Sequence, residues 1–169
     1  FTYWRGQSAA KQMADAPGAL NDALAGADIA YFSGISLAIL NARSRGRLIR
    51  AIHLARESGA WVAFDPNERP ALWTSPKVMG STVVAAAIVA DIVLPTFPDE
   101  AALFGDASPE AVAARYLSWG AEEVVVKNGA EPAYVASREG QGRVAPQPGA
   151  KSVDPTGAGD SFNGAYLAA

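Results

Sequence analysis

The chain has 169 residues, half of them hydrophobic, and it carries a formal net charge of −3 and no cysteine. This composition is sufficient for one compact core, and so mild a charge gives no reason to expect nucleic acid or a membrane surface as a partner. The lack of cysteine excludes disulfides and thiolate metal sites, and it is compatible with a reducing cytoplasm, where we expect the protein.

The ends of the chain suggest part of a longer protein, and its hydropathy gives no sign of a membrane-spanning segment. It begins at Phe1 rather than at a methionine and ends in an apolar segment, so we interpret it as the central and late part of a longer protein. No uninterrupted apolar run reaches the ~18 residues that a membrane-spanning helix needs, and no signal peptide is visible.

In the first half of the chain, short apolar segments are predicted to alternate with helices. Pro17 and Gly18 predict a break, Gly59 is the expected end of the longest helix, Gly46 is a point where that helix could divide, and Ser75 before Pro76 is typical of a helix start. The predicted strands are 1–5, 28–32 and 61–64, and the predicted helices are 8–13, 21–25, 37–58 and 75–90.

The second half continues the alternation and then changes to a hairpin. Strands are predicted at 92–94 and 123–127, helices at 99–104, 108–120 and 165–169, and a hairpin between 134–135 and 143–144. Strands alternating with helices predict a mostly parallel sheet covered on both faces. The carboxyl ends of such strands share one edge, where ligands bind in open α/β sheets, and polar residues follow several of them: 33–34, 65–67, 95–96, 127–129 and 157–160.

Residues 154–164, with the sequence DPTGAGDSFNG, are the most informative stretch. Gly157 and Gly159 allow close approach of the backbone to a ligand, and the first N–H groups of a following helix would attract an anion such as phosphate. Asp160 then places a carboxylate where an anion should bind. That charge is explained if Asp160 accepts a proton from a hydroxyl group while the amides hold the phosphoryl group that this hydroxyl attacks.

Simpler explanations of this loop are a structural turn, a dinucleotide site or a P-loop. A glycine-rich turn before a helix is often purely structural. A dinucleotide fingerprint would need a third glycine where Phe162 stands, and a phosphate-binding P-loop would need a Gly-Lys-Ser/Thr sequence. The whole string instead resembles the C-terminal signature of the ribokinase-like (PfkB) sugar kinases.

This resemblance implies a ribokinase-like three-layer α/β/α fold, with residues 1–169 forming part of one kinase domain. It also implies that Asp160 is the catalytic base and that the backbone of Gly157, Ala158 and Gly159 forms the anion hole. Thr156, Gly157 and Gly159 would contact ATP. In that family an N-terminal lid often forms a dimer, so a homo-oligomer is an expected assembly.

Residues 65–73, with the sequence DPNERPALW, narrow the resemblance. Together with 1–5 and 33–38, they are similar to the 2-keto-3-deoxygluconate kinases of the same family. By that resemblance Tyr3, Arg5, Asn67 and Arg69 bind the sugar acid. The paired arginines suit a substrate carboxylate, because a guanidinium group binds planar anions with two donors.

Two further positions are assigned by the same resemblance. Lys127 and Gly129, after a valine-rich strand, would lie beside the phosphates of ATP. Glu100 matches the glutamate of the family's Asn-x-x-Glu motif and would organise Mg²⁺ through water, although Phe97 stands in the Asn position and Thr96 is the neighbouring substitute.

The expected reaction is transfer of the γ-phosphoryl group of ATP to the primary hydroxyl of a sugar acid. The alternatives are another PfkB kinase of the fructokinase or ribokinase type, a nucleotide or sugar-acid sensor without catalysis, and a dinucleotide-dependent oxidoreductase. Retention of Asp160 argues against a sensor. His53, the single histidine, is interpreted as a packed or partly exposed helix residue rather than a base, and the arginines of 43–56 as a solvated helix face.

Overall fold

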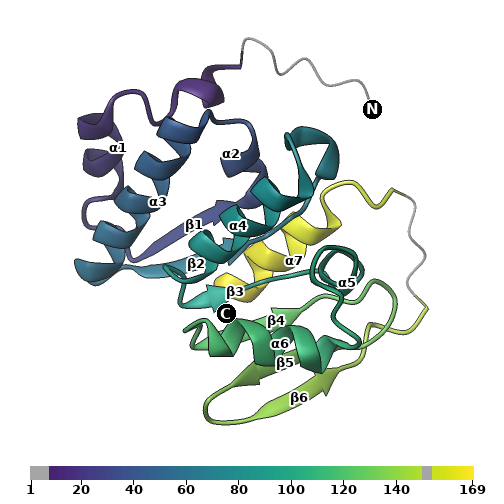
Figure 1. Cartoon of the computed structure of the whole chain (residues 1–169). Helices are drawn as coiled ribbons and strands as arrows, with labels where there is room; N and C mark the ends of the chain where they lie inside the picture. The colour runs from purple at the N-terminus through teal and green to yellow at the C-terminus, as the bar shows by residue number, and fades with distance from the viewer. Residues whose placement is uncertain (1–7, 150–153) are drawn as a thin grey trace.

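The computed structural model describes residues 8–149 and 154–169, so the predicted strand at 1–5 lies outside the described residues. A six-stranded sheet with the order β1-β2-β3-β4-β5-β6 runs through the molecule (Figure 1). Neighbours from β1 to β4 pair in parallel, and β5 and β6 extend the sheet as an antiparallel hairpin. The strands are β1 (Ile29–Ser33), β2 (Trp61–Asp65), β3 (Ile92–Val93), β4 (Glu123–Val126), β5 (Ala133–Ser137) and β6 (Gln141–Val144). The mostly parallel sheet and the hairpin are therefore confirmed.

Most helix boundaries follow from local caps. The side chain of Ser75 accepts a hydrogen bond from the Val78 N–H at 3.2 Å, and Ser108 does the same for Ala111 at 3.3 Å. Short 3₁₀ turns occupy Ala9–Gln12 and Pro70–Leu72. The helices are α1 (Pro17–Leu24), α2 (Gly34–Ala38), α3 (Ala42–Glu57), α4 (Pro76–Ala87), α5 (Phe97–Phe104), α6 (Pro109–Ser118) and α7 (Ala158–Leu167).

Two helix predictions were wrong in detail. Pro17 does not break the chain but begins α1, because a proline in the first turn has no helical hydrogen bond to lose. The long helix predicted over 37–58 is two helices, and the division lies at Asn41 rather than at Gly46. The side-chain oxygen of Asn41 accepts the Ser44 N–H at 2.9 Å and so caps α3.

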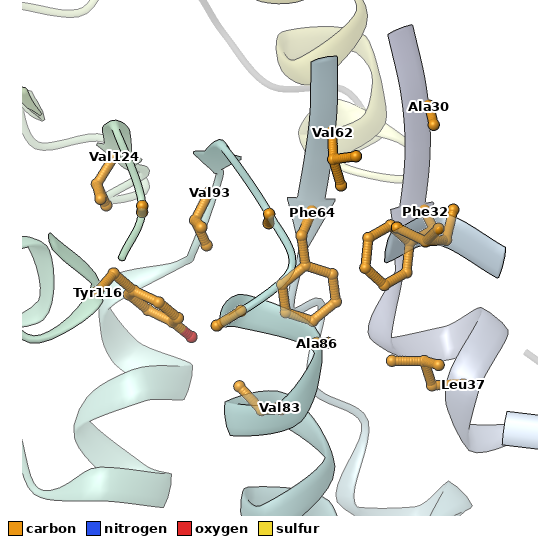
Figure 2. Packing of buried hydrophobic residues seen from close by; sticks show 14 of the residues in the cluster. Ala30, Phe32, Leu37, Val62, Phe64, Val83, Ala86, Val93, Tyr116 and Val124 are labelled. Atoms are coloured by element: carbon orange, nitrogen blue, oxygen red, sulfur yellow. The ribbon is translucent and has the colours of Figure 1, made fainter. Parts of the chain in front are cut away.

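The main core lies between one face of the sheet and the helices α2, α3, α4 and α6. Figure 2 shows Phe32, Phe64 and Val93 pointing from the strands toward Val83 of α4 and Tyr116 of α6. The rings of Phe32 and Phe64 stack with their centroids 4.8 Å apart. This packing fixes β1 and β2 side by side, so that Ser33 lies opposite Asp65 where the two strands end.

The opposite face of the sheet carries α7 (Figure 1). Tyr31 alternates with the core-facing Phe32, and its hydroxyl contacts Asn163 of α7 at 3.2 Å. Ile29, Tyr31 and Trp61 on this face are nevertheless 42, 44 and 51% exposed. Within the described residues, helices thus cover β1 to β5 on one face and only part of the other face, and β6 is exposed along its length. No helix there combines the length and apolarity that crossing a membrane requires.

Candidate active site

The strand ends and the first turn of α7 enclose a polar cavity of about 210 Å³. Its wall carries three carboxylates and two cationic groups from segments far apart in the sequence. The lining side chains include Asp65, Asn67, Arg69, Asp99, Lys127 and Asp160, and the backbone of Gly157 and Gly159 completes it. The structure therefore brings together the polar strand ends that the sequence placed on one edge.

The first turn of α7 is built on a left-handed glycine. Gly157 is the N-cap with φ of +73°, a conformation that strains any residue with a side chain. Its carbonyl accepts the Ser161 N–H at 2.8 Å, which starts the helix. The Ala158 N–H already donates to the Pro155 carbonyl at 3.1 Å, whereas Gly159 and Asp160 stand in the first turn, where amides have no partner within the helix.

A second, more apolar cavity of about 370 Å³ adjoins the first one. It lies between the end of β4, the β5–β6 hairpin and α7, and its wall includes Gly129, Val144, Pro146 and Phe162. Thr96, Lys127 and Gly159 border both cavities. The two cavities thus meet at Lys127 and the glycine-rich turn. Thr156 is exposed and is not among the residues that line either one.

Lys127 is held at this junction by buried polar side chains. Its Nζ donates to Oδ1 of Asn163 at 3.1 Å and lies 3.2 Å from Oδ2 of Asp65. Nδ2 of Asn163 donates to the same Asp65 oxygen at 2.7 Å. A Cβ added to Gly159 would lie 3.9 Å from Nζ of Lys127, so the amine lies directly against the turn that begins α7.

Arg69 and Asn67 occupy the loop after β2. Asn67 has φ of +35°, and its N–H donates to Oδ1 of Asp65 at 3.1 Å, which holds the turn. Arg69 donates to the Glu68 carbonyl at 2.7 Å and lies 3.9 Å from Oδ2 of Asp99. Its side chain is 53% exposed, so it does not need an anionic ligand to compensate for burial. Burial raises the pKa of Asp99, and the Arg69 charge opposes that shift.

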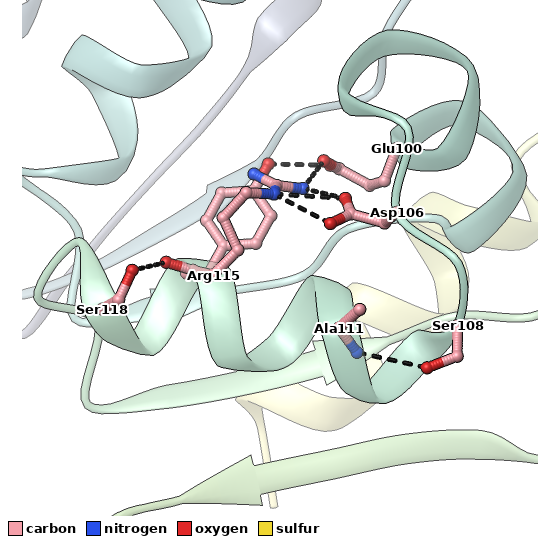
Figure 3. A network of polar contacts seen from close by, with 7 residues as sticks. Glu100, Asp106, Ser108, Ala111, Arg115 and Ser118 are labelled. Carbon is pink, nitrogen blue, oxygen red and sulfur yellow. Dashed lines mark hydrogen bonds and ion pairs between the residues drawn. The ribbon is translucent and has the colours of Figure 1, made fainter.

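Glu100 lies in the core and not on the cavity wall. It is fully buried, with Oε1 accepting from the Tyr116 hydroxyl at 2.7 Å and Oε2 from Nη2 of Arg115 at 2.6 Å. Figure 3 shows this network, in which Arg115 also pairs with Asp106. Burial and the charge of Glu100 raise the pKa of the neighbouring Glu68 to about 9, and both Glu68 oxygens are buried without a hydrogen-bond partner.

The carboxylates in and near the cavity do not by themselves form a magnesium site. Over residues 8–149 and 154–169, no group of three His, Cys, Asp or Glu side chains is arranged to hold a metal ion. Both Glu100 oxygens are engaged by protein donors, so its water-mediated contact with Mg²⁺ stays a prediction. Tyr3 and Arg5, the other predicted sugar contacts, lie outside the described residues.

Sequence reasoning missed Asn163 and Asp99 as members of the site. Asn163 follows Asp160 by three residues, which places both on one side of α7, and this spacing was the available signal. Asp99 precedes Glu100 in the first turn of α5, so its side chain takes a different direction from the buried one. Neither the place of Asp99 in the cavity wall nor the contact of Asn163 with Lys127 could be predicted without knowing which strands lie side by side.

A family profile and the sequences of known proteins place the chain in the same family. The profile of the pfkB family carbohydrate kinases matches residues 1–169. The 2-dehydro-3-deoxygluconokinase of Escherichia coli K12 is 41% identical over 174 residues, which cover 99% of this chain and 56% of that protein. The chain therefore spans about half the length of the curated relatives it matches.

Solved structures of similar proteins agree with this family assignment. The crystal structure of a PfkB protein from Polaromonas sp. JS666 has a TM-score of 0.75 and 38% identity, covering 85% of this chain and 46% of that one. Aminoimidazole riboside kinase from Salmonella enterica, complexed with aminoimidazole riboside and an ATP analog, has a TM-score of 0.73 and 27% identity, with 82% and 46% coverage.

Proposed function

Since this chain belongs to the pfkB family of carbohydrate kinases, we propose that it transfers the γ-phosphoryl group of ATP to the primary hydroxyl of 2-keto-3-deoxygluconate, also called 2-dehydro-3-deoxygluconate. The observation that carries this proposal is the meeting of two cavities at Lys127 and the first turn of α7. A kinase needs such a junction, because donor and acceptor must approach in line on either side of the transferred group.

The sugar acid would occupy the smaller, polar cavity. Asp160 lies in its wall at the start of α7, where it would accept the proton of the attacking hydroxyl. Asn67 and Arg69 come from the opposite loop, and Arg69 would offer two donors to the substrate carboxylate. The similarity to 2-dehydro-3-deoxygluconokinases supports a sugar acid over a neutral sugar.

ATP would occupy the larger cavity, with its phosphates toward the junction. Gly129 and Phe162 line the apolar part, and Lys127 lies at the end that opens to the sugar. The first-turn amides of α7, with Gly157 and Gly159 leaving the backbone accessible, would stabilise charge on the transferred phosphoryl oxygens. The Ala158 amide would join them after leaving the Pro155 carbonyl. Mg²⁺ bound to the nucleotide would supply further neutralisation of phosphate charge.

An ADP-release assay on the full-length protein tests this proposal. ATP is supplied with 2-keto-3-deoxygluconate, its galactonate epimer, fructose, ribose or gluconate in parallel reactions. We expect the largest kcat/KM with a keto-deoxy sugar acid. Equal or better turnover of fructose or ribose would assign the chain to another PfkB activity. Nucleotide binding without turnover on any substrate would indicate a sensor.

A further inference from the structure

Four polar side chains from distant parts of the chain meet beneath the first turn of α7. Tyr31 comes from β1, Asp65 from the end of β2, Lys127 from the residue after β4, and Asn163 from α7 itself. Asp65 and Asn163 are each 1% exposed, and the Lys127 side chain is 11% exposed. A buried polar group is costly unless it is hydrogen-bonded, so this cluster requires its partners to stay together.

Asn163 is the member that connects the other three. Its Oδ1 accepts from Lys127 at 3.1 Å, and its Nδ2 donates to Asp65 at 2.7 Å and to the Tyr31 hydroxyl at 3.2 Å. These contacts fix the orientation of the amide, because exchanging oxygen and nitrogen would set an NH₂ group against the ammonium of Lys127.

The contacts of Lys127 leave it able to bind a ligand. An ammonium group has three N–H donors. Among the described residues, Asn163 accepts one of them and Asp65 lies 3.2 Å from Nζ as an ion-pair partner, so at least one donor remains for a ligand. Asp65 Oδ2 contacts both the Asn163 amide and the Lys127 ammonium, so its negative charge is shared between these two groups. Asp65 therefore holds Lys127 in place without fully neutralising its positive charge.

The location of this ammonium gives the cluster a function. Lys127 borders both cavities and lies against Gly159. We propose that Asn163 and Asp65 are positioning residues that hold the Lys127 ammonium at the junction of the cavities, with one N–H aimed at the phosphoryl group in transfer. This proposal rests on the kinase function and adds to it two residues that act through a third.

A purely structural role for Asn163 is the competing explanation, since it also ties α7 to the sheet. A second tie at the far end of α7 provides a matched control. The Tyr166 hydroxyl donates to Oε1 of Glu123 at 2.7 Å, away from both cavities. Tyr166→Phe removes that hydrogen bond, so it should lower stability and leave kcat within about twofold of wild type.

A double-mutant cycle in the full-length protein measures whether Asn163 acts through Lys127. The variants are Asn163→Ala, Lys127→Gln and their combination, with kcat and the KM of the sugar acid measured for each. We expect Asn163→Ala to lower kcat about ten- to a hundredfold with little change in that KM, because a charge-assisted contact is lost or misplaced. The double variant should be no slower than Lys127→Gln alone.

The contrary results are equally defined. The positioning role would be overturned if the kcat losses of the two single variants multiplied in the double variant. It would also be overturned if Asn163→Ala kept wild-type kcat, or if Tyr166→Phe lost as much kcat as Asn163→Ala. Asn163→Ser replaces Asn163→Ala in the cycle if the alanine variant does not fold.

Nucleotide binding separates a failure of this inference from a failure of the kinase proposal. If the wild-type protein turns over no sugar, the affinities of the non-hydrolysable analogue AMP-PNP and of AMP are compared by calorimetry. Asn163→Ala and Lys127→Gln should each weaken AMP-PNP about tenfold or more and leave AMP unchanged. Equal effects on both nucleotides, or none on either, would refute the positioning role.

Discussion

The substitution Gly34→Ala should distort the active-site loop, because there is no room for a side chain at this position. Gly34 begins α2 directly after β1, and it faces the loop that follows β2. A Cβ built on Gly34 would lie 1.8 Å from the Pro66 carbonyl oxygen, whereas Cβ atoms essentially never approach closer than 3.0 Å. The two backbone segments would therefore have to separate by about 1.2 Å.

This displacement should affect both stability and catalysis. Forcing extra atoms into a packed region typically costs about 1–3 kcal/mol. For a chain of this size each 1 kcal/mol shifts Tm by about 2–4 °C, so we expect a Tm lower by about 2–12 °C. Pro66 lies between Asp65 and Asn67 of the cavity wall. A misplacement of about 1 Å can cost on the order of 10²-fold in rate, so turnover should fall more than stability alone explains.

Gly46→Ala is the matched control for this experiment. Gly46 lies inside α3 with nothing within 4 Å of an added Cβ. Alanine should stabilise that helix by about 0.5–1 kcal/mol. Thermal unfolding and ADP release are measured for both variants. If Gly34→Ala matched Gly46→Ala in Tm and in turnover, the close approach of β1 and the Pro66 loop would not be a real constraint.

Substitutions at four further positions test individual roles. Asp160→Asn should keep ATP binding but lose about 10²–10⁴-fold in kcat, and near wild-type turnover would exclude it as the base. Gly159→Val should lower turnover more than sugar affinity, because a side chain whose Cβ lies 3.9 Å from Nζ of Lys127 blocks close approach of the backbone to phosphate. Unchanged turnover with lost sugar affinity would contradict this. Arg69→Ala should raise KM for the sugar acid about ten- to a hundredfold and hardly affect a neutral sugar, with Arg69→Lys already impaired; an equal effect on both sugars would refute the carboxylate contact. Glu68, whose pKa is raised to about 9, keeps a proton in the folded state that the unfolded chain releases above its ordinary pKa of 4.5, so stability should fall as pH rises between these values. Urea unfolding of Glu68→Gln should show a flatter pH dependence and a gain over wild type near pH 8; parallel curves would show that Glu68 is ionised in the folded protein.

Local chemistry explains why much of the fold could be predicted from the sequence. Ser75 and Ser108 are caps whose hydrogen bonds reach three residues along the chain, and Gly59 adopts the left-handed conformation expected after a helix. The division at Asn41 was missed because the helical periodicity continues across it. The side chain of Asn41 competes for the backbone and starts a new helix, which periodicity alone does not reveal.

The site shows the same distinction between local and distant contacts. Asp160, Arg69 and Lys127 stand in short motifs whose chemistry can be interpreted from neighbouring residues. The contact of Asn163 with Asp65 spans 98 residues, and its contact with Tyr31 spans 132. Such contacts depend on which face of the sheet α7 covers. The sequence implied the cavity, but it did not show that Asn163 would contact Lys127 and Asp65 beside it.

The structure also changes the argument for a sugar acid. A buried guanidinium without an anion would be costly, and burial of Arg69 would by itself have demanded a substrate carboxylate. Its side chain is 53% exposed and lies 3.9 Å from Asp99, so desolvation does not demand an anionic ligand. A substrate carboxylate could still replace that long contact by two short, charge-assisted hydrogen bonds, which a neutral sugar cannot offer. The preference for a sugar acid over a neutral sugar therefore depends on the planar pair of Arg69 donors more than on the need to neutralise a buried charge. Arg69→Lys is the most informative substitution at this position, because it keeps the charge and loses that pair of donors.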